Sequence, residues 1–241
     1  ETLDYRYSDI SLGDVSMNLP KGYKWLPADQ VYFVFDGLID ALDHYPYGTN
    51  IVLPIDRSVF DDPENWILVR YVDSGYVHEQ DFDLADFDLY FMEKQIAVNI
   101  FRDSLIKYER PPEDLIGWSM KPVQNSEAHR VDWGYEFAID NRASQISKES
   151  RVLGRYGFVE LSGRGDKAET SWSDAFDLLA NSVNYKIGSK YSDHHANDPL
   201  YKYGTIYLVD PNLVAKVSFF DKYWKWGLAA ILLLLIVARR M

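Results

Sequence analysis

Cysteine is absent from the 241-residue sequence. This excludes a disulfide framework, a thiolate nucleophile and a cysteine-type zinc site, so the core must hold the fold without covalent help. The glycine-rich fingerprints of phosphate and dinucleotide sites are also missing. The sequence therefore indicates no cofactor and no metal site.

Positive charge is scarce as well. Lysine and arginine together number 25 against 37 acidic residues, which gives a formal net charge of -12, and the basic residues are scattered along the chain. A chain of this charge repels phosphate backbones. We expect no nucleic-acid partner.

Apolar residues, in contrast, make up 47% of the chain and aromatic residues 15%. This content is sufficient for a packed interior and is far from the composition of disordered chains. The length suits one large domain. We predict an α+β domain over residues 1–220 and a transmembrane anchor over residues 221–241.

The anchor prediction depends on an uncharged run from Trp226 to Ala238. About 13 helical residues cover roughly 20 Å, less than the roughly 30 Å hydrocarbon core, so flanking residues must help to span it. The alternative is a buried core helix, but four successive leucines make the run apolar on every side, which favours lipid. The residues expected to define the anchor are Trp224 and Trp226 at the interface, Leu232 and Leu235 in the span, and Arg239 and Arg240 beyond it.

The two ends of the chain predict one orientation. Arg239 and Arg240 place the C-terminus in the cytoplasm, because basic residues that flank a span stay on that side. The sequence begins at Glu1 without an initiator methionine or an apolar leader, so we expect a cleaved secretory signal upstream. The domain then lies outside the cytoplasmic membrane. Because a short span favours assembly, the expected partners are the lipid bilayer and other membrane proteins or a second copy of the chain.

The apolar pattern predicts helices packed on a mainly antiparallel sheet. Helical spacing of apolar residues appears over residues 27–42, 89–108 and 171–181. Strand-like runs cover residues 15–19, 23–26, 51–55, 66–72, 115–120, 130–139 and 152–161, of which the last three are expected to form an antiparallel meander. Arg164-Gly165-Asp166 is expected to form a turn between a strand and a helix.

Side chains for acid–base or nucleophilic chemistry are few. His129 and Asp132, with Glu160 as a further acid, could form an acid–base group, but a histidine on a strand is more often structural. Ser119 lies in a segment that begins like a nucleophile elbow, yet Lys121 stands where that turn needs glycine. Ser104 and Lys107 have serine–lysine spacing without the supporting motifs. The sequence assigns no catalytic residue, and Ser119, His129 and Asp132 are those that an enzyme would use.

Two clusters resemble metal sites. His194 and His195 lie beside Asp193 and near Asp198, but adjacent histidines usually point apart, so we expect solvated loop residues. An acidic cluster lacks the glycine and the closing glutamate of a calcium loop, and we expect it to cap a helix N-terminus. The members of this cluster are Asp81, Asp83, Asp86 and Asp88.

Short motifs in a fixed order resemble a bacterial family of predicted membrane-anchored proteins, catalogued as a domain of unknown function (number 2167 in that series). They are Leu19 to Leu26, Asp73 to Val77, Gly117-Trp118 before Pro122, His129 to Trp133, Arg151 to Arg155 with Gly157, Gly188 with Tyr191, Tyr203-Gly204 and Ala215-Lys216. The resemblance implies a signal peptide, a periplasmic domain and a C-terminal helix in the inner membrane. It implies no activity, and the His194-His195 segment departs from the family pattern.

These features predict a non-enzymatic scaffold or interaction subunit of an inner-membrane complex. An envelope hydrolase that acts on cell wall or lipid is the alternative. A carbohydrate-binding module is a third hypothesis, and it depends only on the abundance of tyrosine and tryptophan, which core packing explains equally well.

Overall fold

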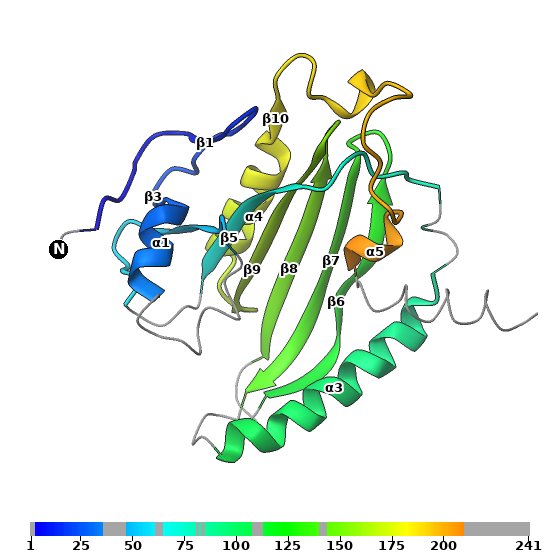
Figure 1. The fold of residues 1–241 in the computed structure, drawn as a ribbon. Coiled ribbons are helices and arrows are strands. Elements are labelled where there is room, and N and C mark those ends of the chain that lie inside the picture. The colour runs from blue at the N-terminus through cyan, green and yellow to red at the C-terminus, as the bar shows by residue number, and fades with distance from the viewer. Residues whose placement is uncertain are drawn as a thin grey trace, which may run out of the picture.

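A seven-stranded antiparallel sheet forms the centre of the molecule (Figure 1). The computed structural model describes residues 3–35, 47–60, 65–80, 82, 85–107, 113–139 and 144–209. The strand order is β3-β4-β5-β9-β8-β7-β6, and each neighbouring pair is antiparallel. The strands are β3 (Tyr23–Leu26), β4 (Asn50–Pro54), β5 (Trp66–Asp73), β6 (Glu113–Asn125), β7 (Arg130–Ile139), β8 (Ser144–Leu153) and β9 (Gly157–Asp166).

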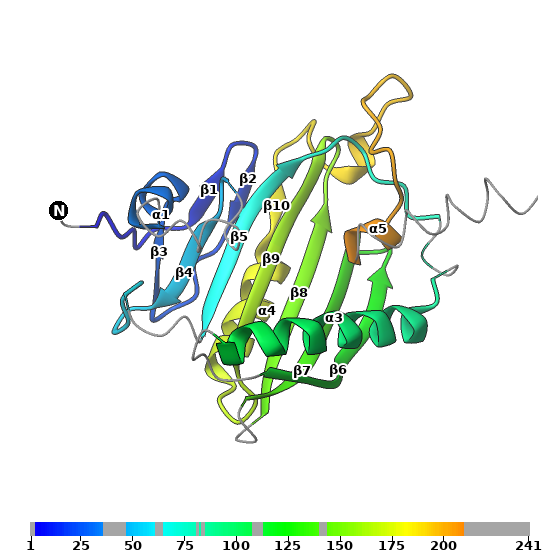
Figure 2. The ribbon, with the colours of Figure 1, turned by 60° about the horizontal axis from the view of Figure 1, so that its bottom comes forward.

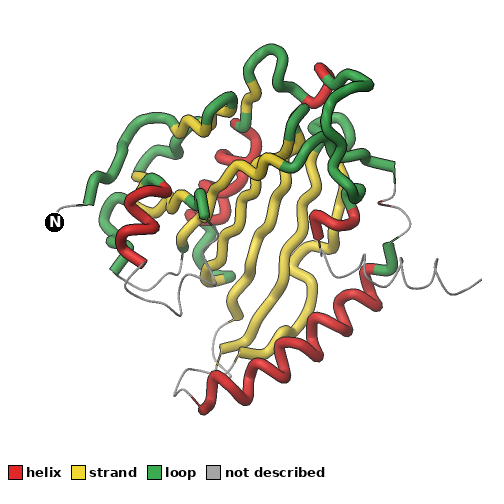
Figure 3. The backbone as a smooth tube through the Cα atoms, in the orientation of Figure 1, coloured by secondary structure: helices red, strands yellow, loops and turns green. Residues whose placement is uncertain are grey.

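Helices lie on both faces of this sheet (Figures 2 and 3). Helix α4 (Ser171–Ser182) packs on β9, β8 and β5, next to a small sheet of β1 (Ile10–Leu12), β2 (Val15–Met17) and β10 (Asn184–Tyr185). The other face carries α1 (Ala28–Phe35), α3 (Phe87–Lys107), α5 (Ile206–Val209) and a 3-10 helix η2 (Tyr191–Asp193). The architecture is therefore α+β with antiparallel sheets, as the sequence predicted.

Strand β9 contributes side chains to a hydrophobic core on each face of the sheet. Val159 and Leu161 are fully buried against Phe176 and Leu179 of α4, whereas Phe158 belongs to the core cluster on the opposite face. Successive side chains of a strand point to opposite faces, so one strand serves both layers. Burial of each large apolar side chain stabilises the fold by about 1.5–3 kcal/mol.

The helix predictions agree with the structure where it is described. Helices α3 and α4 begin and end within two residues of the predicted ranges 89–108 and 171–181. Helix α1 covers the start of the predicted range 27–42, and residues 36–46 lie outside the described residues. Asp86 caps α3, because its Oδ1 accepts a hydrogen bond from the backbone N–H of Leu89 (3.0 Å). Capping is thus confirmed for Asp86, while Asp81 and Asp83 lie outside the described residues.

One strand prediction and one turn prediction are wrong. The run 152–161 is not one strand: it contains the end of β8, a turn at residues 154–156 and the start of β9. Strand β8 begins at Ser144 and was missed because Ser, Gln, Lys and Glu mask its period of two. Arg164-Gly165-Asp166 is no turn, since all three residues pair within β9. Tertiary pairing overrides the local turn preference of Gly165 and Asp166.

The predicted anchor, residues 221–241, lies outside the described residues, which end at Val209 of α5. Among the helices that are described, none has both the length and the apolar character to cross a bilayer.

Candidate functional site

His129 stands at the tight turn between β6 and β7, at one end of the large sheet. Its φ angle is 48°, a left-handed conformation that histidine adopts more readily than most side chains. The turn is held by Ala128, whose N–H donates to Asn125 Oδ1 (3.0 Å), and by Leu153, whose N–H donates to the carbonyl of His129 (2.8 Å). The position of the imidazole is therefore set by the sheet.

The partner of His129 is Glu79, not Asp132. His129 Nδ1 lies 3.4 Å from Glu79 Oε2, whereas Asp132 Oδ2 accepts a 2.7 Å hydrogen bond from Arg130 Nε. Ser119 donates to the carbonyl of Ser147 (3.2 Å). The three residues named for an enzyme thus each have a different partner. Sequence reasoning missed Glu79 because it precedes His129 by 50 positions with no motif between them.

Four rings form what we call the histidine–tyrosine stack: His129, Tyr191, Tyr76 and His194. The centroid distances along the stack are 4.1 Å, 4.5 Å and 3.7 Å, with interplanar angles of 28°, 26° and 11°. Tyr191 is buried and donates to the carbonyl of Val77 (2.9 Å). The stack joins the β6–β7 turn, the segment after β5 and the loop after β10, so it ties three distant parts of the chain together.

Charges flank both ends of the stack. Burial raises the pKa of Glu79, and the hydrogen bond from His129 offsets part of that rise. At the other end, Asp198 accepts hydrogen bonds from Arg155 Nε (2.7 Å) and Nη2 (2.8 Å), and Arg155 holds the pKa of the Asp198 carboxyl well below its usual range. Burial also raises the pKa of Tyr191, which stays a neutral hydrogen-bond donor.

His194 and His195 have different surroundings. His194 is stacked on Tyr76, its Nδ1 lies 3.3 Å from Asp198 Oδ2 and its side chain is 21% exposed, so it is only partly solvated, in contrast to the expected solvated loop histidine. His195 is exposed, and its backbone N–H donates to Asp198 Oδ2 (2.7 Å). Asp193 instead accepts backbone N–H groups from Gly188 and Lys190. Within the described part of the chain, histidines and acids form no group of three or more suited to a metal ion.

A second polar cluster, the arginine–carboxylate array, crosses the middle of the sheet and consists of Arg70, Glu160, Arg151 and Glu149. Glu160 bonds both Arg70 and Arg151, and Arg151 Nη1 lies 3.3 Å from Glu149 Oε2. The Arg151 guanidinium also stacks over Trp133 at 4.9 Å. Arg151 is thus paired with two carboxylates. Burial raises the pKa of Glu149.

The outer face of α3 carries apolar side chains, which we call the outer stripe: Leu89, Met92 and Ile96. Their exposed fractions are 51%, 59% and 58%. At about 100° per residue, the spacing of three and then four places them on one side of the helix. The opposite side of α3 packs Phe87, Tyr90 and Phe91 against the sheet. Helix α3 is therefore apolar on two opposite faces, of which one is covered.

Comparison with known proteins gives a family and a distant structural likeness. The solution structure of cyanobacterial PsbP from Synechocystis sp. PCC 6803 is similar at 14% identity and a TM-score of 0.39, over 76% of this chain and 92% of that one. No curated protein matches the sequence. Residues 4–239 match the family model described as "Protein of unknown function (DUF2167)". The chain belongs to this family.

Proposed function

We propose that the chain is a non-enzymatic interaction protein of the inner membrane, with its domain in the periplasm, which holds a helix of another membrane-protein subunit against the outer stripe of α3. The observation that carries the proposal is the second apolar face of α3. A helix of a soluble domain normally has one apolar face, and exposed apolar patches mark interaction sites.

The chemistry of the outer stripe favours a helix as its partner. Leu89, Met92 and Ile96 have the three-and-four spacing of the seam in which helices pack against each other. Met92 at the centre is flexible and polarizable, and methionine adapts to the shape of a partner surface. The contrast with α4 supports this assignment, because Leu178 is its exposed large apolar side chain and has no such neighbours on that face.

Membrane attachment supplies the second half of the proposal. The uncharged run from Trp226 to Ala238 followed by Arg239 and Arg240 favours a span with a cytoplasmic C-terminus. A span shorter than the bilayer is accommodated by thinning or by association with other spans. The proposed partner is therefore a membrane protein that reaches α3 with a periplasmic helix.

The test uses the full chain in its own membrane. We expect that Leu89→Gln, Met92→Gln and Ile96→Gln together abolish retention of the partner subunit after extraction in mild detergent, because polar side chains remove the apolar contact. Leu178→Gln, a matched change on α4, should leave retention unchanged. A photoreactive side chain at position 92 should crosslink to the same partner, and one at position 178 should not. Retention of the partner by the triple variant would overturn the proposal.

An envelope hydrolase is the second candidate, and the pairing of His129 with Glu79 favours it. A carboxylate that orients one imidazole nitrogen leaves the other free for acid–base work. His129→Ala and Glu79→Gln should then each abolish hydrolysis of an envelope substrate while the chain stays folded. Loss of folding stability with unchanged hydrolysis would instead assign the pair a structural role.

A further inference from the structure

We propose that Ile187 and Leu200, the apolar tip of the domain, insert into the headgroup region of an anionic bilayer and orient the domain on the membrane. This inference rests on the proposed membrane attachment and names a second surface, distinct from the outer stripe of α3. Its evidence is the exposure of two large apolar side chains on braced turns.

Ile187 is 94% exposed at the tip of a tight turn. The turn is closed by the N–H of Ser189, which donates to the carbonyl of Lys186 (3.0 Å), and Gly188 supplies the positive φ of 91°. Turn tips are usually polar, because an exposed apolar side chain gains nothing from water. A β-branched side chain held out in this way suits a surface that removes it from water.

Leu200 lies on the neighbouring loop and is 54% exposed. The carbonyl of Pro199 accepts from the N–H of Tyr76 (2.8 Å), and the N–H of Tyr201 donates to the carbonyl of Tyr76 (2.8 Å). Leu200 is thus flanked on both sides by backbone hydrogen bonds to a residue that belongs to the histidine–tyrosine stack. These hydrogen bonds fix the backbone on either side of Leu200.

Arg155 clamps the two loops together. Its Nη1 donates to the carbonyl of Gly188 (3.1 Å), and its Nε and Nη2 donate to Asp198. Its backbone N–H donates to the carbonyl of Ser189 (3.0 Å). One side chain therefore fixes the turn of Ile187 beside the loop of Leu200. The segments that carry the two apolar side chains are therefore held together by Arg155.

The charge around the apolar tip fits anionic lipid. Lys190 and Lys202 are exposed on the segments that carry Ile187 and Leu200, in a chain with a net charge of -12. Lys186 is also exposed, and its Nζ lies 3.3 Å from Asp14 Oδ1. The nearby carboxylates are engaged, since Asp198 pairs with Arg155 and Asp193 accepts backbone N–H groups. An apolar tip surrounded by lysines suits the membrane–water interface. There, apolar side chains enter the boundary of the acyl chains and ammonium groups contact lipid phosphates.

The chain length permits this placement. Helix α5 packs with Tyr191 in the same core cluster, and its last residue is Val209. The segment from there to the predicted anchor at residue 221 can extend at most about 40 Å. The domain can therefore rest its tip on the bilayer that holds the anchor.

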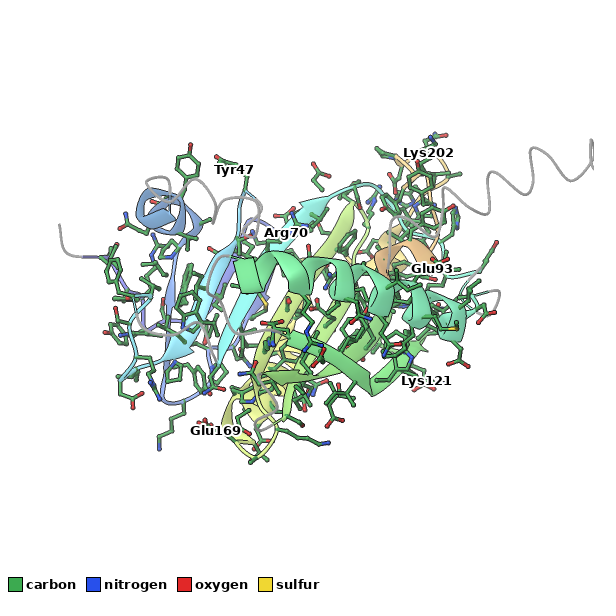
Figure 4. The ribbon with its side chains drawn as sticks, turned by 90° about the horizontal axis from the view of Figure 1, so that it is seen from below. Tyr47, Arg70, Glu93, Lys121, Glu169 and Lys202 are labelled. Atoms are coloured by element: carbon green, nitrogen blue, oxygen red, sulfur yellow. The ribbon has the colours of Figure 1, made fainter. Side chains whose placement is uncertain are left out.

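The absence of native cysteine makes the test direct, since each introduced cysteine is a unique labelling site. Full chains that carry Ile187→Cys or Leu200→Cys receive a bimane fluorophore and are reconstituted into nanodiscs of phosphatidylcholine with or without phosphatidylglycerol. Some of the lipids carry a shallow nitroxide quencher. The matched control is Ala168→Cys, which lies beyond the opposite end of β9. Figure 4 shows the adjacent Glu169 and Lys202 on opposite sides of the molecule.

We expect quenching at positions 187 and 200, stronger with phosphatidylglycerol, and none at position 168. Lys190→Glu with Lys202→Glu should lower the membrane-apposed population on the order of tenfold. Equal quenching at all three positions would overturn insertion of the tip. If the chain still co-migrates with the discs, the proposed membrane attachment is retained. A chain that fails to stay with the discs would overturn both. Labels at positions 187 and 200 that stay unquenched would overturn insertion of the tip, and a crosslink from a photoreactive side chain placed there in the native membrane would assign the tip to a protein partner.

Discussion

At the scale of single residues, the close packing around residue 157 leaves room only for glycine. A Cβ atom at this position would lie 2.0 Å from the carbonyl oxygen of Val72, inside any tolerable contact. The pairing of β9 with β5 therefore requires glycine here, at the first residue of β9.

Replacement of Gly157 by alanine should cost about 3 kcal/mol of unfolding free energy, because β5 and β9 must move apart to admit the methyl group. Gly117→Ala is the matched control. Nothing lies within 4 Å of a Cβ built there, so its effect should stay within about 0.5 kcal/mol. Urea unfolding followed by circular dichroism measures both, and equal effects would contradict the packing argument.

Ionisation of Asp198 makes the stability of the fold depend on pH. Arg155 lowers the pKa of Asp198 in the folded chain below the ordinary value of 3.8. The ionised carboxylate therefore stabilises the fold fully above that ordinary value, and the stabilisation is lost as the pH falls through the lower folded-state pKa.

Asp198→Asn should lower the melting temperature at pH 7, and the difference from the unchanged chain should shrink on acidification below about pH 4. Asp177→Asn, at an exposed carboxylate paired with Lys148, is the control and should have a smaller effect at pH 7. Thermal unfolding over a pH series measures this. A constant difference at every pH would mean that ionisation of Asp198 does not contribute.

At the scale of elements, α3 has a defined start and two apolar faces. Asp86 occupies the N-cap and satisfies one of the free N–H groups of the first turn. Arg102 pairs with Asp114 and Gln95 Nε2 donates to the carbonyl of Leu115, so polar contacts align the helix with edge strand β6. This alignment fixes which side of α3 faces outward.

Asp86→Ala should cost about 1 kcal/mol of unfolding free energy, because the capped N–H group of Leu89 loses its acceptor. Asp86→Ser should recover most of that loss, since serine is also a good cap. Chemical unfolding of the three chains provides the measurement. If alanine and serine are equivalent, the carboxylate does not act as a cap.

At the scale of the whole molecule, three features lie on different parts of the sheet and its helices. Its middle carries the arginine–carboxylate array, where arginine and carboxylate charges pair with each other. One end is closed by the histidine–tyrosine stack, which fixes the loops that bear the apolar tip. The outer stripe of α3 lies on a different surface, so the proposed membrane contact at the tip and the proposed partner contact at the stripe do not exclude each other.

The sequence alone determined the fold class and the main helices, because the 3.6-residue and two-residue periods of apolar residues are local properties of the chain. It also identified the family and predicted an anchor over residues 221–241. The sequence did not predict strand β8, since polar residues on both faces of this strand hide its two-residue period. Only the tertiary structure paired His129 with Glu79, stacked Tyr76 on Tyr191 and, through Arg155, linked the turn of Ile187 to Asp198. These residues come from segments far apart in the chain, and only long-range strand pairing brings such segments together.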